Sequence, residues 1–257
     1  MQRIDLKSTI LTAAAWAIFL NAWAAVGAAG PPDPDSSATP ATILTRYVEA
    51  TQNHEDALRG ASIQVEINAS VPKLKEQGKL RALRKMSKVG QITYQLLGFQ
   101  GDNTVKSQVI ARYLQAEQQG QGDESLAVTP ANYKFKFKGR KQTESNQEVF
   151  TFQVSPRKKK VGLFKGEIWL DAKTYLPVVE KGRLVKNPSI FFKRVDFERD
   201  FAIRNGIAVP QHMTSTIDTR LIGKVNLSID YSNFDPNGDT DEKPQPQSVA
   251  STGSTAE

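Results

Sequence analysis

The chain has 257 residues, a net charge of +7 and no cysteine. The absence of cysteine excludes a disulfide framework, a thiolate nucleophile, a cysteine zinc site and a lipid-modified N-terminal cysteine. Residues 41–234 hold 31 Lys and Arg against 19 Asp and Glu, a balance of +12, so this part of the chain is strongly basic. Such a charge favours anionic partners.

The first thirty residues have the layout of a secretory signal peptide. A charged start, MQRIDLK, precedes an uncharged run over residues 8–29 that ends in small side chains spaced for cleavage. We therefore expect a signal peptide over residues 1–29 and a linker over residues 30–40. A membrane anchor remains the alternative, because about 20 apolar residues can span a bilayer.

Two helices are expected in the region that follows. Apolar residues fall near helical spacing in residues 39–60, where Thr39 and Pro40 suit the N-cap and the first helical position. A second helix is expected over residues 102–119, because Val105, Val109 and Tyr113 share one face.

The rest of residues 41–234 is dominated by strand patterns. Residues 61–71 alternate apolar and polar side chains without a break, and residues 133–138 and 150–154 repeat this period of two. The pattern predicts about nine strands separated by turns. The basic segment 72–88 is assigned neither a helix nor a strand. We expect a mainly β, α+β domain: a single curled antiparallel sheet that forms an unclosed β-barrel, with helices plugging its concave side.

The C-terminal segment, residues 235–257, has no aromatic residue and a single aliphatic one, Val249. It has too few apolar side chains to offset the entropy of ordering, so we expect a disordered acidic tail. One domain over residues 41–234 is the expected organisation.

The residues that usually carry catalysis or bind metals are scarce. His54 and His212 lie far apart, without metal-ligand spacing around either, and no nucleophile elbow or phosphate-binding loop is present. His54 is expected to be exposed at the end of the first helix. Carboxylates at 196, 198 and 200 alternate along one strand but are interleaved with Arg and Lys, which favours a salt-bridged solvent face that includes Arg199. We expect no catalytic residue, no metal and no cofactor, and therefore a protein that is not an enzyme.

A cationic run, Arg157, Lys158, Lys159 and Lys160, lies between two expected strands. No aromatic residues alternate with these lysines, and export would remove the chain from nucleic acid, so a nucleic-acid site is disfavoured. Two interpretations remain open: a basic rim that meets anionic lipid head groups, and a solvated hairpin turn.

The order of the elements resembles the LolA-like superfamily of periplasmic outer-membrane lipoprotein carriers. The resemblance covers most of residues 41–234 and rests on GEIWLDAKTYLPVVEKGRL, FFKRVDFERDF, NGIAVPQHMTSTID and GKVNLSIDYSNF. Its most specific piece is residues 166–178, in which a strand ends at Leu170-Asp171, turns over Lys173-Thr174 and returns at Leu176-Pro177-Val178.

The resemblance implies an unclosed barrel whose hydrophobic cavity shields acyl chains in the periplasm. The inward-facing candidates for the cavity are Phe135, Phe137, Phe150, Phe152, Ile168, Leu170, Val195, Phe197, Leu227, Ile229 and Tyr231. A dry core made of the same side chains is the alternative. The superfamily also implies an arginine that holds a lid helix, for which Arg81, Arg84 and Arg112 are all candidates.

The leading hypothesis is a monomeric periplasmic carrier for lipid or lipoprotein acyl chains, whose basic rim attracts anionic head groups. The alternative is a non-enzymatic regulatory module of the envelope stress response that contacts a membrane protein partner.

Overall fold

The computed structural model describes residues 38–120, 123–188 and 190–238. The chain divides into two units, residues 1–38 and 39–257, and every described helix and strand belongs to the second. The expected signal peptide, most of the linker and most of the tail lie outside the described residues. The described elements run from Pro40 to Asp235.

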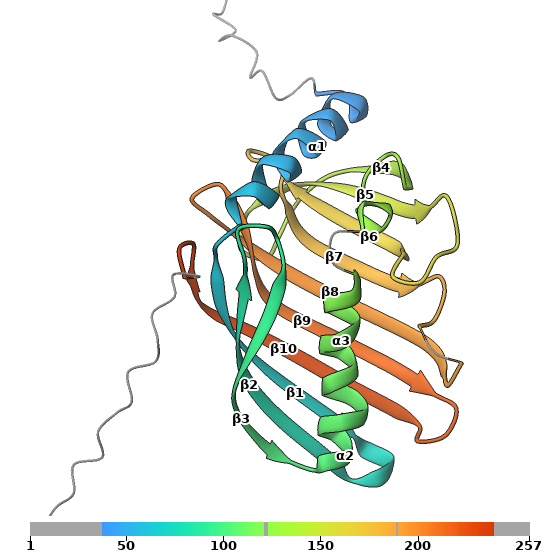
Figure 1. The fold of residues 1–257 in the computed structure, drawn as a ribbon. Coiled ribbons are helices and arrows are strands. Elements are labelled where there is room, and N and C mark those ends of the chain that lie inside the picture. Colours follow the sequence, from blue (N-terminus) through green and yellow to red (C-terminus); the bar gives the residue numbers. More distant parts are fainter. Residues whose placement is uncertain (1–37, 121–122, 189, 239–257) are drawn as a thin grey trace, which may run out of the picture. The chain divides into compact units, whose positions relative to one another are not determined.

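All the described strands belong to one antiparallel sheet of ten strands (Figure 1). The strands are β1 (Ser62–Val71), β2 (Glu76–Met86), β3 (Ile92–Gly101), β4 (Tyr133–Gln142), β5 (Glu148–Pro156), β6 (Phe164–Asp171), β7 (Pro177–Leu184), β8 (Phe192–Arg204), β9 (Ile207–Thr219) and β10 (Lys224–Asp235). They are ordered β3-β2-β1-β10-β9-β8-β7-β6-β5-β4, so β3 and β4 are edges that do not pair with each other. The sheet is an unclosed barrel, which confirms the predicted fold class.

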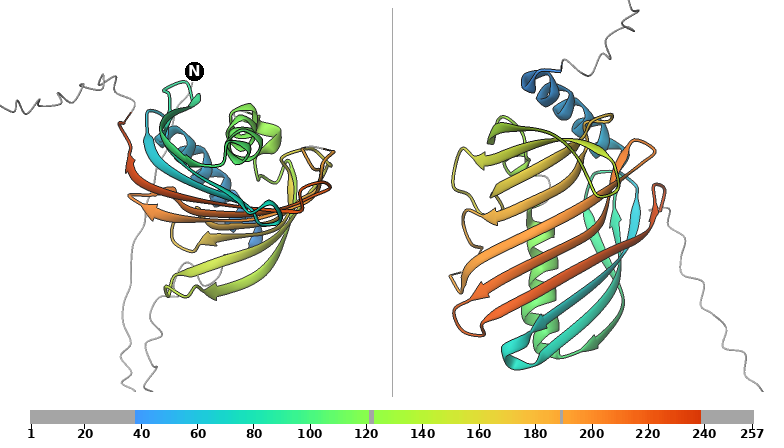
Figure 2. Two further views of the ribbon diagram at one scale, coloured as in Figure 1. Left: turned by 90° about the horizontal axis from the view of Figure 1, so that it is seen from below. Right: turned by 180° about the vertical axis from the view of Figure 1, so that it is seen from behind.

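The second predicted helix crosses the concave side of this sheet (Figures 1 and 2). It consists of α2 (Asn103–Val105), a π-helical turn η2 (Lys106–Ile110) and α3 (Ala111–Gly120), and we call residues 103–120 the crossing helix. Its residues Val105, Val109 and Ile110 are buried against the sheet. Two short 3₁₀ turns, η1 (Pro72–Leu74) and η3 (Glu124–Leu126), complete the helical elements of the described part.

The first predicted helix is α1 (Pro40–Ala57), in which the ring of Tyr47 packs on that of Phe135 of β4. Thr39 is its N-cap as predicted, with Oγ1 accepting a hydrogen bond from the Thr42 amide at 3.3 Å. Its buried residues are Ile43 and Tyr47, and the Tyr47 hydroxyl donates to the Val128 carbonyl at 2.7 Å. Within the described residues, no helix is both long and apolar enough to cross a bilayer.

Alternation along each strand places one set of side chains on the concave side. In β1 the apolar residues of the predicted alternation, Ile63, Val65, Ile67, Ala69 and Val71, are all buried. They pack with apolar residues of β2, β10 and the crossing helix to form one part of the core. A second, aromatic part lies under β4–β6 and α1, where successive rings of Phe135, Phe137, Phe150, Phe152, Tyr47 and Tyr175 are 5.1–6.5 Å apart.

The basic segment 72–88 contains a strand that the sequence analysis missed. Residues 76–86 form β2, which pairs with both β1 and β3, so the sheet has ten strands and not about nine. Gly78, Leu80 and Ala82 are its buried positions, whereas Lys79 and Arg81 are exposed. The inward side chains of β2 are mostly small, and charged residues lie between them. The alternation of apolar and polar residues is therefore hard to recognise in the sequence.

Candidate functional site

A cavity of about 530 Å³ lies between the crossing helix and the strands β8, β9 and β10. The helix contributes Val109, Arg112 and Tyr113 to its wall. Strands β6 and β8–β10 contribute mainly apolar side chains: Phe164, Val195, Phe197, Met213, Ile217, Val225 and Leu227. The cavity reaches the surface, because Arg112 at its wall is exposed. An apolar wall with a few polar groups is the usual make-up of a small-molecule site.

Only some of the predicted cavity residues line this space. Val195, Phe197 and Leu227 do, and Tyr231 lines a second pocket of about 270 Å³ nearby. Phe150, Phe152, Ile168, Leu170 and Ile229 are fully buried in the core. Phe135 and Phe137 are partly buried and belong to the aromatic part of the core.

Two ionisable side chains that the sequence analysis did not assign to a site, Glu180 and Arg199, also line the cavity. Glu180 comes from β7 and Arg199 from β8, and Nη1 of the arginine lies 3.3 Å from Oε2 of the glutamate. Arg199 therefore does not belong to the salt-bridged solvent face predicted for β8. Its neighbours Asp196 and Glu198 do, since they pair with Arg183, Arg194 and Lys181.

The Glu180–Arg199 pair is enclosed but not fully covered. The Glu180 side chain is 12% exposed, and burial raises its pKa although the positive charge of Arg199 acts in the opposite direction. The Arg199 side chain keeps 36% of its surface exposed, while residues of both the cavity and the second pocket surround it. Its exposed surface therefore faces these pockets.

A second ion pair attaches the crossing helix to the sheet. Arg84 of β2 lies with Nε 3.1 Å from Oε1 of Glu117 on α3, and the hydroxyl of Tyr94 on β3 donates to the other carboxylate oxygen. The Arg84 and Glu117 side chains are 18% and 24% exposed. Of the three arginines considered for a lid contact, Arg84 is thus the one that bonds the helix across the concave side. Arg81 is exposed, and Arg112 belongs to the helix itself.

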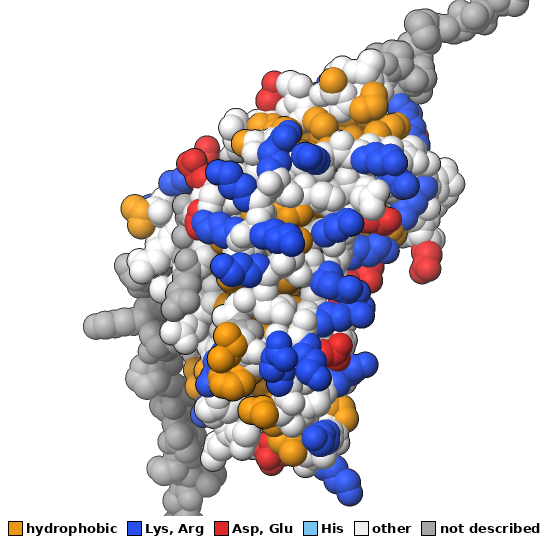
Figure 3. All heavy atoms as spheres, turned by 90° about the vertical axis from the view of Figure 1, so that its right-hand side faces the viewer, with side chains coloured by type: hydrophobic (Ala, Val, Ile, Leu, Met, Phe, Trp, Pro, Cys, Tyr) orange, Lys and Arg blue, Asp and Glu red, His pale blue; other side chains and the backbone are white. Residues whose placement is uncertain are grey.

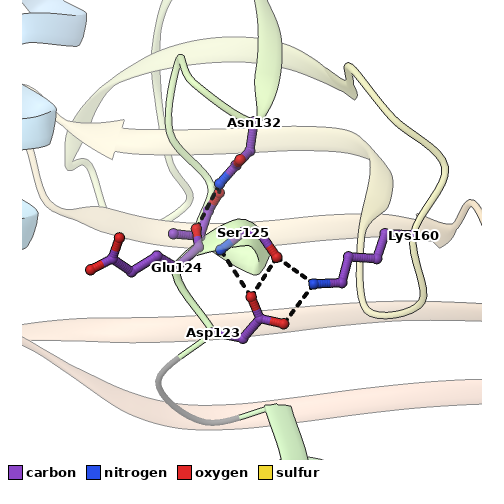
Figure 4. A network of polar contacts seen from close by, with 6 residues as sticks. Asp123, Glu124, Ser125, Asn132 and Lys160 are labelled. Carbon is purple, nitrogen blue, oxygen red and sulfur yellow. Dashed lines mark hydrogen bonds and ion pairs between the residues drawn. The ribbon is translucent and has the colours of Figure 1, made fainter.

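The cationic run occupies the connection between β5 and β6, and half of it has structural partners; those of Lys160 are drawn in Figure 4. Nζ of Lys160 lies 2.6 Å from Oδ2 of Asp123 and also donates to Ser125. The hydrogen bond from Lys160 to Asp123 is the largest cause of the lowered pKa of this carboxylate, which is about 2. Nε of Arg157 donates to the Pro130 carbonyl at 3.0 Å.

Lys160 and Arg157 thereby hold the loop that leads from the crossing helix to β4. Asn132 closes the same loop, because its Nδ2 donates to the Glu124 carbonyl at 2.7 Å (Figure 4). Leu126 and Val128 of this loop line the cavity. Lys158 and Lys159 are exposed. Figure 3 shows the side of the molecule that lies to the right in Figure 1, where Lys and Arg side chains greatly outnumber Asp and Glu.

The two histidines lie in different surroundings. His54 is half-buried and lines the second pocket, so the expectation that it is exposed was wrong: α1 packs against the end of the sheet. His212 lies on β9, and its Nδ1 is 2.7 Å from Oδ1 of Asp230 on β10. In the part of the chain that the structure describes, no group of three or more His, Asp or Glu is placed to hold a metal ion.

No family model matches the chain, and no curated protein is a significant match. Solved structures with a similar fold include a DUF1329 family protein from Desulfovibrio piger, with 10% identity over 76% of this chain and 91% of that chain and a TM-score of 0.41. A LolA superfamily protein from Nitrosomonas europaea shares 10% identity over 77% of this chain and 93% of that chain, with a TM-score of 0.33. The MucA/MucB complex of Pseudomonas aeruginosa contains a chain with 12% identity over 72% of this chain and 93% of that chain, with a TM-score of 0.27.

These structures include the superfamily that the sequence resembles. With identities of 10–12% and TM-scores below 0.5, they are distant likenesses. The function proposed below therefore rests on the cavity.

Proposed function

We propose that this protein is a non-enzymatic carrier that binds the acyl chain of a lipid or lipoprotein in the periplasm. The observation that supports the proposal is the cavity of about 530 Å³ beneath the crossing helix. Its volume falls within the usual range of ligand pockets, roughly 300–1,000 Å³. Removing an acyl chain from water into such a cavity is favourable by roughly 25 cal/mol for each Å² of apolar surface buried.

The direct test is lipid binding by the protein purified from an envelope extract. Bound lipid is extracted and identified by mass spectrometry, and the emptied protein is titrated with the fluorescent apolar probe N-phenyl-1-naphthylamine. We expect a co-purified acyl lipid and saturable probe binding. A folded protein that carries no lipid and binds no probe would overturn the proposal, and recovery of one crosslinked membrane protein in stoichiometric yield would then favour the regulatory alternative.

A substitution that fills the cavity locates the binding. Val195 lines the cavity and is 8% exposed, so Val195→Trp places a bulky ring in the space that the probe would occupy. We expect the probe affinity to fall at least about tenfold, which corresponds to roughly 1.4 kcal/mol. The matched control is Val89→Trp, at a turn position that is 82% exposed. Equal probe affinity of the two variants would mean that the probe binds elsewhere.

A further inference from the structure

Arg199 lies where the two pockets of the concave side meet. Arg199 and Tyr113 line both the cavity of about 530 Å³ and the second pocket of about 270 Å³. Arg199 is therefore positioned at the end of the cavity that adjoins the second pocket. From there, inward residues of β8 extend the cavity wall through Phe197 and Val195 to Phe192. At about 3.3 Å for each strand residue, this wall is about 20 Å long.

The guanidinium group of Arg199 has hydrogen-bond donors that no described residue accepts from. An arginine carries five N–H donors in a planar fork. Among the described residues, the hydrogen bond that the structure gives this group is the one to Glu180, from Nη1 to Oε2 at 3.3 Å. A ligand that displaces water from a charged group must supply partners for its remaining donors, or they stay unsatisfied. In the pocket, these partners must come from water or from a ligand.

The charges of the cavity wall favour an anionic ligand group. The wall contains two arginines, Arg112 and Arg199, and one carboxylate, Glu180, which leaves a balance of +1. In the second pocket, Arg84 is already paired with Glu117. An apolar chain that ended in an uncharged methyl group beside Arg199 would leave the unused donors without acceptors.

We propose that Arg199 binds the carboxylate of a single-chain fatty acid, whose hydrocarbon chain lies along the cavity wall from Phe197 to Phe192. This inference rests on the proposed function and specifies the class of ligand. A carboxylate matches the planar fork of a guanidinium with two parallel hydrogen bonds. The chain then occupies the apolar surface formed by β8, β9 and β10 and covered by the crossing helix.

The experiment compares ligands that differ only in the head group. Pyrene-labelled hexadecanoic acid and its methyl ester are titrated at pH 8 against the full mature protein, with N-phenyl-1-naphthylamine as the probe of the cavity itself. We expect the acid to bind at least about tenfold more tightly than the ester, a difference of roughly 1.4 kcal/mol. Equal binding of acid and ester would overturn the inference and leave the proposed carrier function intact. Failure of all three ligands to bind would overturn the proposed function itself.

Variants assign the preference to Arg199. The single substitution Arg199→Met would leave Glu180 as an unpaired, enclosed carboxylate. The test variant therefore combines Arg199→Met with Glu180→Gln, and the single variant Glu180→Gln is its reference. We expect the double variant to bind acid and ester equally, at the ester affinity of the wild type, and the single variant to keep the preference for the acid. Arg204→Met, at an exposed arginine of β8 that does not line the cavity, should leave the preference intact.

Two outcomes would contradict the assignment. Retention of the preference for the acid in the double variant would place the anion site elsewhere. A lysophosphatidate that binds while the fatty acid does not would show that the pocket takes a phosphate and not a carboxylate.

Discussion

His54 shows how one side chain is affected by its position at the end of a helix. It lies in the last turn of α1, where the helix dipole would favour a positive charge. Its Nδ1 is nevertheless buried and has no hydrogen-bond partner among the described residues. Burial therefore dominates and lowers the pKa of His54 below its usual value.

The lowered pKa predicts that His54 reduces stability in acid. Well above pH 6.5 the imidazole is neutral in both the folded and the unfolded state. As the pH drops below about 6.5, the unfolded chain binds the proton more readily than the folded protein, so the free energy of unfolding decreases. The loss is about 1.4 kcal/mol for each unit by which folding lowers the pKa. His54→Gln should therefore lose less stability than the wild type between pH 7.5 and 5.5 in thermal melts.

The neighbouring exposed residue provides the control. Asn53→Gln changes a side chain of the same helix turn without removing a titrating group, so it should follow the wild type. Carboxylates titrate equally in all three proteins and cancel in the comparison. An identical pH dependence of His54→Gln and the wild type would contradict the role assigned to burial.

At the scale of the elements, the crossing helix depends on a few contacts with the sheet. Besides its buried apolar residues, it is held by Glu117, which bonds both Arg84 and Tyr94. These partners come from β2 and β3, whereas the cavity lies on the other side of the helix, toward β8 and β9. The ion pair therefore fixes the helix that covers the cavity without occupying the ligand space.

Removal of this ion pair should loosen the helix more than the sheet. Arg84→Met is expected to cost roughly 1–3 kcal/mol, because a hydrogen bond to a partly buried charged group is lost. Amide hydrogen exchange should accelerate in residues 111–120 and change little in β9 and β10. Lys79→Met is the control from the same strand: its pair with Glu66 is 46% and 35% exposed and is worth less than about 1 kcal/mol. Unchanged exchange of the helix amides in Arg84→Met would show that apolar packing alone holds it.

The elements also show what the sequence could predict. In β1 every second residue is apolar, so the sequence indicates which side chains point into the core. Strand β2 carries many charges and few large inward side chains, and for this reason it was not predicted. In β8 the same period of two, counted from Val195 and Phe197, places Arg199 on the concave side. The sequence contained that signal, but the nearby carboxylates favoured an assignment to the solvent face.

The position of the cavity depended on contacts that alternation cannot reveal. Phe150 and Phe152 face inward as predicted, but Tyr47 of α1 and Phe135 of β4 pack in the same aromatic cluster. Phe197 and Leu227 face inward equally, and there the crossing helix leaves space. Whether an inward side chain is in a dry core or in a cavity is decided by elements distant in the sequence.

At the scale of the whole molecule, the question is how a basic surface serves a carrier. Edge strand β4 carries exposed Lys134, Lys136 and Lys138, which suit protection of an edge against pairing with another chain. The cationic run, unlike the lysines of β4, lies in the connection between β5 and β6. Lys159 borders an outer groove together with Lys165, Lys181 and Arg183. Three carboxylates also line this groove, and two of them pair with Lys181 and Arg183, so Lys159 and Lys165 are its cations without an ion pair among the described residues. The structure thus provides two groups of cations, one along an edge and one beside a groove near the cavity loop.

The cationic run, which reaches the groove at Lys159, is the group expected to meet anionic lipid. Lys160 is excluded from the test, because reversing its charge would also break the contact with Asp123 that holds the cavity loop. Lys158→Glu with Lys159→Glu keeps that contact. Each cation near an anionic membrane contributes roughly 1 kcal/mol, so the double reversal should weaken binding to phosphatidylglycerol vesicles more than about tenfold in a sedimentation assay at low salt.

A second double reversal separates position from net charge. Lys134→Glu with Lys136→Glu changes the net charge by the same amount on edge strand β4. If the rim interpretation is right, this variant keeps most of its vesicle binding, because its cations are not those that face the membrane. If both variants lose binding equally, general attraction by the +12 charge of residues 41–234 accounts for the effect. If neither loses it, the cationic run is a solvated turn whose structural role is carried by Arg157 and Lys160.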